Sequence, residues 1–155
     1  MAFAMRFVDD RRLFANVNES VGGKSSRSDD IMLVQALLKT VFSKEPIKVT
    51  GHFDATTAKL IKYYQSKRQK RGKPDGIVSP VYETSFYKAW SYTIIDLQIT
   101  ANNILVATGL SEPLVEFLKL SYPHLVGPLD NVMDFSISPM EERPYSNPTQ
   151  PSEGF

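Results

Sequence analysis

Cysteine is absent from this chain of 155 residues, and histidine occurs only at His52 and His124. Without cysteine, a thiol nucleophile, a disulfide framework and a zinc site with cysteine ligands are excluded. The two histidines lie in separate segments and match no metalloprotease spacing. Since the general base of a hydrolase is most often histidine, we expect a protein that is not an enzyme and that uses no cofactor or metal.

Long hydrophobic runs are also missing. No stretch approaches the ~20 apolar residues of a membrane span. The first residues, MAFAMRFVDDRRLF, carry charges from Arg6 onward, so they do not form the continuous apolar core of a signal peptide. We therefore expect no membrane partner. The localisation stays open between the cytoplasm and export by a route that needs no cleaved signal.

A strong net charge is the third absence, because the formal charge is +1 at pH 7. This balance predicts no overall attraction to polyanions, so electrostatic recognition must come from local clusters. What is present is an ordinary globular composition, with 42% hydrophobic and 23% charged residues. The chain length favours one domain with extensions.

Apolar residues at helical spacing predict a mainly α fold. Three helices are expected over residues 29–43, 55–67 and 80–90. Asp54 is a suitable N-cap for the second helix. Ser79 is a suitable N-cap for the third, with Pro80 at the first helical position, where a missing N–H costs nothing.

Two further segments are predicted to be helical. Residues 92–109 fit either a helix or a strand, and we favour a helix because Gly109 is a suitable stop. A last helix is expected over 111–122, ending before Pro123.

The predicted organisation has four parts: a lead-in over 1–27, a three-helix unit over 28–90, a C-terminal helical extension packed on it over 91–137, and a tail over 138–155. Four prolines make the tail a candidate for disorder and for contact with a protein partner.

One short pattern occurs twice. Gly51–Asp54 and Gly76–Ser79 both read as glycine, any residue, a large apolar residue and a helix N-cap. The glycines are expected at positive φ, and the apolar residue should pack beside the helix start. One shared core is therefore predicted from the residues that face it: Phe53, Ile61, Tyr64 and Phe86 with Val34 and Leu38.

The order of motifs over residues 28–90 resembles the peptidoglycan-binding domain family. The resemblance rests on Val34-Gln35-x-x-Leu38, Val49-Thr50-Gly51-His52-Phe53, Thr57, Ile61-x-x-Tyr64-Gln65 and Asp75-Gly76-Ile77-Val78-x-Pro80. It implies a compact three-helix fold and a peptidoglycan glycan or stem peptide as partner. Thr50, Asp54, Ala55, Ser79 and Tyr82 depart from the family pattern, and the basic segment 66–73 is longer than usual.

The glutamines of these motifs, Gln35 and Gln65, are interpreted as structural, because a half-buried amide can satisfy the backbone groups that a turn leaves unpaired. Recognition of an anionic polymer is instead assigned to the basic segment 59–73 with its tyrosines, since cations meet carboxylates and a tyrosine face stacks on a sugar. The candidate ligand-binding residues are His52, Lys59, Lys62, Tyr63, Lys67, Arg68, Lys70, Arg71 and Asp75.

The sequence thus favours a non-catalytic peptidoglycan-binding module. One alternative is an adaptor that keeps the fold without wall binding, and the altered motif residues favour it. A nucleic-acid-binding protein that uses 59–73 is a weaker alternative, because the near-zero net charge argues against it. A wall hydrolase with a site in 91–138 is the weakest.

Overall fold

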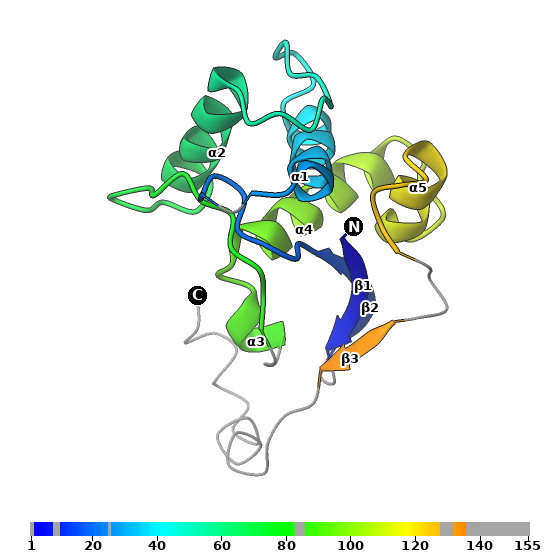
Figure 1. Cartoon of the computed structure of the whole chain (residues 1–155). Coiled ribbons are helices and arrows are strands. Elements are labelled where there is room, and N and C mark those ends of the chain that lie inside the picture. The colour runs from blue at the N-terminus through cyan, green and yellow to red at the C-terminus, as the bar shows by residue number, and fades with distance from the viewer. Residues whose placement is uncertain (1, 8–9, 25, 83–85, 128–131, 136–155) are drawn as a thin grey trace, which may run out of the picture.

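The computed structural model describes residues 2–7, 10–24, 26–82, 86–127 and 132–135 (Figure 1). This part of the chain is mainly helical, as predicted. In chain order the elements are β1 (Phe3–Phe7), β2 (Asp10–Asn16), α1 (Ser28–Val41), α2 (Ala55–Lys67), α3 (Phe86–Ala89), α4 (Thr93–Ala107), α5 (Leu114–Ser121) and β3 (Met133–Phe135). The predicted tail over 138–155 lies outside the described residues.

Two of the three expected helices of the 28–90 unit are confirmed. The helix α2 has the predicted bounds, and its cap is the Asp54 carboxylate, which accepts the Thr57 N–H at 2.8 Å. The helix α1 begins at Ser28, and no side chain caps it. The ambiguous segment 92–109 is helical as α4, and α5 is shorter than the expected 111–122.

The expected helix over 80–90 is wrong. Among the residues of that range that the structure describes, only the single turn α3 is helical, and the chain from Val78 to Val81 is extended. Val78 exchanges two backbone hydrogen bonds with Val21, both 2.9 Å long. Val81 likewise makes two hydrogen bonds, both with the side-chain amide of Asn16, which accepts the Val81 N–H at 3.0 Å and donates to the Val81 carbonyl at 2.7 Å. These bonds to the lead-in hold the segment extended and override the Ser79–Pro80 start signal.

The lead-in itself contains a β-hairpin that the sequence reasoning did not predict. β1 pairs antiparallel with β2 and parallel with β3, so the strand order is β2-β1-β3. Ala4, Met5 and Phe7 on β1 are all buried, so both faces of this strand are covered. The alternation of apolar and polar residues that marks a half-exposed strand is therefore missing.

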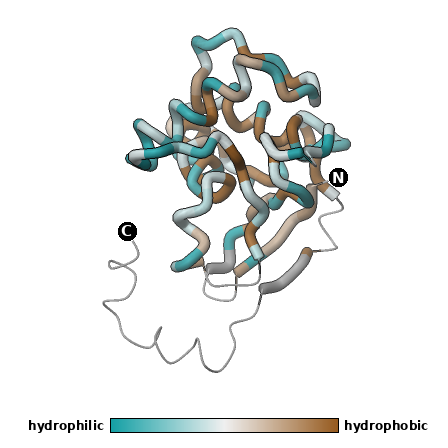
Figure 2. The backbone as a smooth tube through the Cα atoms, turned by 60° about the vertical axis from the view of Figure 1, so that its left-hand side comes forward, coloured by the Kyte–Doolittle hydropathy of each residue, from teal (hydrophilic) through white to brown (hydrophobic). Residues whose placement is uncertain are grey.

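The hydrophobic core is one cluster of buried side chains from the hairpin to Val126. Helix α1 lies at its centre, where Leu33, Val34 and Leu37 are fully buried. Hydrophobic stretches run through the middle of the molecule and hydrophilic ones along its periphery (Figure 2). Among the helices of the described residues, none combines the length and the apolar character needed to cross a membrane.

The predicted shared core is correct for most of its members. Ile61 and Tyr64 are fully buried with Val34 and Leu38, and Phe86 is half-buried against the rings of Phe7 and Phe14. Phe53 is the exception, because 36% of its surface is exposed. Its ring lies at the rim beside Gly22 rather than beneath the start of α2. The matching residue of the second pattern, Val78, is fully buried.

Candidate functional site

A buried glutamine holds the first glycine loop in place. The Gln35 Oε1 accepts the N–H groups of Thr50 and Gly51, each at 2.9 Å. Its Nε2 donates to the His52 carbonyl at 2.9 Å and to the Thr57 hydroxyl at 3.0 Å. Gly51 has a φ of 80°, and a Cβ there would meet Ser28. One amide therefore ties the loop to the first turn of α2.

The second glycine loop is held in the same way. The Gln65 Oε1 accepts the Gly76 N–H at 2.9 Å, and its Nε2 donates to the Ile77 carbonyl at 3.0 Å and to the Thr93 hydroxyl at 3.1 Å. Gly76 has a φ of 73°. The structural interpretation of both glutamines and the positive φ of both glycines are confirmed.

The two arrangements differ in the distance along the chain to the threonine. Thr57 follows Gly51 by six positions, whereas Thr93 follows Gly76 by seventeen. Thr57 stands in the first turn of α2, the helix directly after the first loop, whereas Thr93 stands in the first turn of α4, which follows the second loop only after α3. Gln65 therefore bonds the second glycine loop to α4. Residues 80–90, which were expected to form the third helix of the unit, lie between this loop and α4.

A buried polar network joins α2 to α4. The Tyr64 phenol donates to the Asp96 carboxylate and lies 2.8 Å from the Thr100 hydroxyl, to which Arg68 donates at 3.2 Å. Burial, followed by the hydrogen bond to Asp96, raises the pKa of the Tyr64 phenol well above its ordinary value. The phenol therefore stays protonated and serves as a donor that fixes the end of α2 against α4.

This network forms one side of an open hollow of about 650 Å³. Its lining combines cations, an indole and a carboxylate: Arg68, Gln69, Lys70, Arg71, Trp90, Ser91 and Asp96. The side chains of Gln69 and Arg71 both donate to the Ser91 carbonyl at 3.0 Å. The loop after α2 is therefore tied to the segment before α4. Such a wall can hold an anionic group beside a flat apolar one.

Lys70 has an unusual backbone in this loop. Its φ is 55°, in the left-handed region that residues other than glycine seldom adopt. The neighbouring N–H groups of Gln69 and Arg71 bond to the carbonyls of Tyr64 and Gln65 at the end of α2. This capping holds Lys70 in its strained conformation, a cost of about 1–3 kcal/mol that folded proteins carry most often at functional positions.

A second, smaller hollow of about 220 Å³ shares Arg71 and Ser91 with the first and also touches Asp75. Asp75 accepts hydrogen bonds from the Gln65 amide and from the Ile77 N–H, at 3.1 and 2.9 Å. The Arg71 guanidinium lies 3.9 Å from the same carboxylate. Among the candidate residues from the sequence, Asp75 thus stabilises the second glycine loop through hydrogen bonds.

The remaining candidates lie elsewhere. Lys59, Lys62, Tyr63 and Lys67 are exposed on α2, and none of them lines either hollow. Tyr63 packs edge-on against the Phe42 ring at a centroid distance of 5.8 Å. The stem of Lys62 covers Gly76. His52 is exposed in the first glycine loop. The structure therefore brings Arg68, Lys70 and Arg71 together in one hollow, places Asp75 beside Arg71 in the smaller one, and leaves the rest on other surfaces.

The candidates from the sequence did not include four residues of the hollow: Gln69, Trp90, Ser91 and Asp96. Trp90 stacks on Phe86 with ring centroids 6.0 Å apart, and 36% of it is exposed. Because it is the only tryptophan of the chain, it was the one feature of the sequence that could have marked a binding position here. Its proximity to Lys70, however, depends on the hydrogen bonds from Gln69 and Arg71 to Ser91, and no local sequence pattern predicts these bonds.

The chain was compared with family models, curated proteins and solved structures. No family model matches the chain, and neither a curated protein nor a solved structure matches it.

Proposed function

We propose that the protein is a non-catalytic module that binds an anionic glycan polymer, with peptidoglycan as the first candidate, at the hollow beside Trp90. The observation that carries the proposal is the lining of that hollow. Three cations, Arg68, Lys70 and Arg71, stand beside an indole that is partly exposed. Cations suit the carboxylates of a stem peptide, and an indole face suits the apolar face of a sugar ring.

The arrangement of helices supports a peptidoglycan-binding-like unit built from α1, α2 and α4. In that unit Gln35 anchors the first glycine loop to α2, and Gln65 anchors the second glycine loop to α4. The unit departs from the compact form expected over 28–90, because the segment of residues 80–90 is inserted before its third helix. Trp90, a lining residue of the hollow, belongs to this inserted segment.

Sedimentation with purified insoluble peptidoglycan at physiological salt tests the proposal. The matched pair Trp90→Ala and Tyr63→Ala compares two exposed aromatic residues, of which only Trp90 lines the hollow. We expect Trp90→Ala to weaken binding about tenfold, in keeping with the stacking energy of an aromatic ring, and Tyr63→Ala to change it less than twofold. The reverse ranking would move the site to the outer face of α2.

A second matched pair separates a specific cation from general charge. Lys70→Asn and Lys67→Asn remove the same charge from two exposed lysines, and asparagine tolerates the positive φ of position 70. Only Lys70 lines the hollow. We expect Lys70→Asn to weaken binding about fivefold and Lys67→Asn less than twofold, since an exposed charge pair contributes up to about 1 kcal/mol.

Duplex DNA measured beside the wall material completes the test. A phosphate-tracking surface would bind DNA with a steep dependence on salt and would respond equally to Lys67 and Lys70. Weak binding to both polymers that salt abolishes would contradict the proposal. In that case the alternative hypothesis, an adaptor that binds a protein partner, would replace it.

A further inference from the structure

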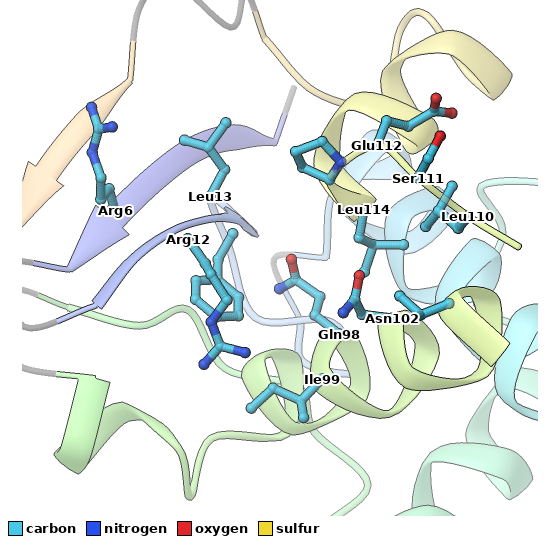
Figure 3. A pocket seen from close by; sticks show the side chains of 13 residues that line it. Arg6, Arg12, Leu13, Gln98, Ile99, Asn102, Leu110, Ser111, Glu112 and Leu114 are labelled. Atoms are coloured by element: carbon cyan, nitrogen blue, oxygen red, sulfur yellow. The ribbon is translucent and has the colours of Figure 1, made fainter.

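A second groove lies on another part of the molecule, between β2, α4 and the loop that leads into α5 (Figure 3). Its volume is about 530 Å³, within the range of ligand sites. The apolar part of the lining includes Leu13, Ile99, Val106 and Leu110. None of its residues lines the hollow beside Trp90, so the groove is independent of the proposed polymer site.

The strand β2 borders this groove with its free edge, because β1 occupies its other edge and the order is β2-β1-β3. At Ala15 that edge is covered by the Gln98 side chain from α4. The Gln98 Oε1 accepts the Ala15 N–H at 2.7 Å, and its Nε2 donates to the Ala15 carbonyl at 2.8 Å. One side-chain amide thus makes the two bonds that a residue of a neighbouring strand would make.

The alternation of an antiparallel ladder identifies the next position of this edge. Since Ala15 directs its N–H and carbonyl away from β1, Leu13 two residues earlier must direct its own peptide groups the same way. Leu13 lines the groove. Within the described part of the chain, no helix or loop group bonds to the Leu13 backbone. The edge therefore presents one donor and one acceptor to the groove.

Charges flank this edge unevenly. Arg12 and Arg6 line the groove on the hairpin side, and Arg6 is the register partner of Leu13 on β1. The Arg12 guanidinium rests over the rings of Phe14 and Phe86, at 5.3 and 5.1 Å from their centroids, which limits its freedom. Glu112 stands on the opposite side, in the loop just before α5 (Figure 3). The hairpin side thus favours an acidic group.

From this juxtaposition we infer that the groove binds an extended acidic peptide segment of a partner protein, which adds a strand to the β2 edge at Leu13. The peptide exchanges two backbone hydrogen bonds with Leu13, about 4.8 Å from β2. Gln98 stops the added strand at Ala15, which sets its register. An acidic side chain of the peptide meets Arg12, and its apolar neighbours cover Ile99 and Val106.

Synthetic peptides titrated into the full ¹⁵N-labelled chain test this inference by NMR. The probes are acetyl-Thr-Val-Glu-Val-Thr-amide, its Gln analogue, and a Glu form that is N-methylated at all five residues and so offers no backbone N–H along the strand. We expect the Glu peptide to bind at about millimolar affinity. It should shift the Leu13 amide and slow its hydrogen exchange about tenfold, while the Ala15 amide, already bound to Gln98, changes little. The N-methylated peptide should leave Leu13 unchanged.

Two variants assign the interactions. Leu13→Pro deletes a donor that faces away from β1, and an edge strand tolerates proline at such a position, whereas Leu13→Ala keeps the donor. Binding should be lost in the first and kept within about twofold in the second, since the ladder with β1 survives in both. Arg12→Gln should weaken the Glu peptide about fivefold and the Gln peptide less than twofold.

An unchanged Leu13 amide with the Glu peptide at several millimolar would overturn the inference, as would equal binding of the N-methylated peptide. Should Leu13→Pro unfold the chain, the N-methylated peptide with the unaltered protein still decides the question. Shifts confined to Trp90 and Lys70 would assign the peptide to the other hollow and also contradict it.

Discussion

The two loop glutamines are completely buried, so no water can replace the hydrogen bonds that they make. Gln35→Leu and Gln65→Leu should each lower the free energy of unfolding by about 2–4 kcal/mol, because each leaves a glycine N–H and a carbonyl unpaired in the interior. Urea denaturation measures the loss. Lys59→Leu on the exposed face of α2 is the control and should stay within about 0.5 kcal/mol. A loss below about 1 kcal/mol in both glutamine variants would mean that water enters the loops.

Phe53 and Ile61 separate the rim of the core from its interior. Phe53→Ala should cost only about 1–2 kcal/mol, because more than a third of the side chain is already exposed. Ile61→Ala should cost about 2–5 kcal/mol, since Ile61 is fully buried and a cavity would remain. The same urea experiment compares the two. An equal loss would show that the Phe53 ring is needed to seal the loop beside Gly22.

At the scale of elements, Asp30 in the first turn of α1 and Asp54, the N-cap of α2, differ in burial. Asp54 is exposed, and the hydrogen bonds from the Thr57 hydroxyl and N–H hold its pKa below the ordinary value. Asp30 is buried, and that burial raises its pKa in spite of the N–H groups of Asn18 and Glu19 that donate to it. Asp30 thereby ties the lead-in to α1.

These opposite shifts predict opposite responses to pH. Asp54 contributes stability that is present above its unfolded pKa and is lost as the pH falls through the lowered value. The Asp30 contribution is present below its unfolded pKa and is lost as the pH rises through the raised value. Asp54→Asn should therefore cost more at pH 6 than at pH 3, and Asp30→Asn more at pH 4 than at pH 6. Urea denaturation across these pH values checks both, and parallel pH profiles for the two variants would contradict the assignment.

For the whole molecule, the single hydrophobic cluster predicts one cooperative unfolding transition. The rings of Phe7, Phe14 and Phe86 connect the hairpin to Trp90, the only tryptophan. Phe7→Ala should cost about 3–5 kcal/mol, because Phe7 is almost fully buried. Trp90 fluorescence and helical circular dichroism should still report the same midpoint. Two separate midpoints would show that the hairpin and the helices unfold independently.

The elements that follow local rules were predictable from the sequence. The helix α2 begins where Asp54 caps it, and Gly51 and Gly76 take the positive φ that their turns require. These outcomes depend on groups a few residues apart. Among the candidate site residues, Arg68, Lys70 and Arg71 are sequence neighbours of this kind, so their common location followed directly from the chain.

Other features depend on partners far away in the sequence. The extended chain at Val78 and Val81 is held by Val21 and Asn16, against a local signal for a helix. The placement of Trp90 beside Lys70 depends on the bonds from Gln69 and Arg71 to Ser91. The β2 edge is open at Leu13 because Gln98, 83 positions after Ala15, bonds to the backbone of Ala15 and not to that of Leu13.

The sequence by itself determined the helical class, the α2 cap and the glycine turns, because short-range hydrogen bonds and backbone sterics decide them. Only the tertiary structure decided which helix the second glycine loop is bonded to, that both faces of β1 are covered, and which side chains share a hollow. The physical reason is that a strand pair or a buried amide gains its free energy from groups that the fold brings together, and no local pattern names those groups.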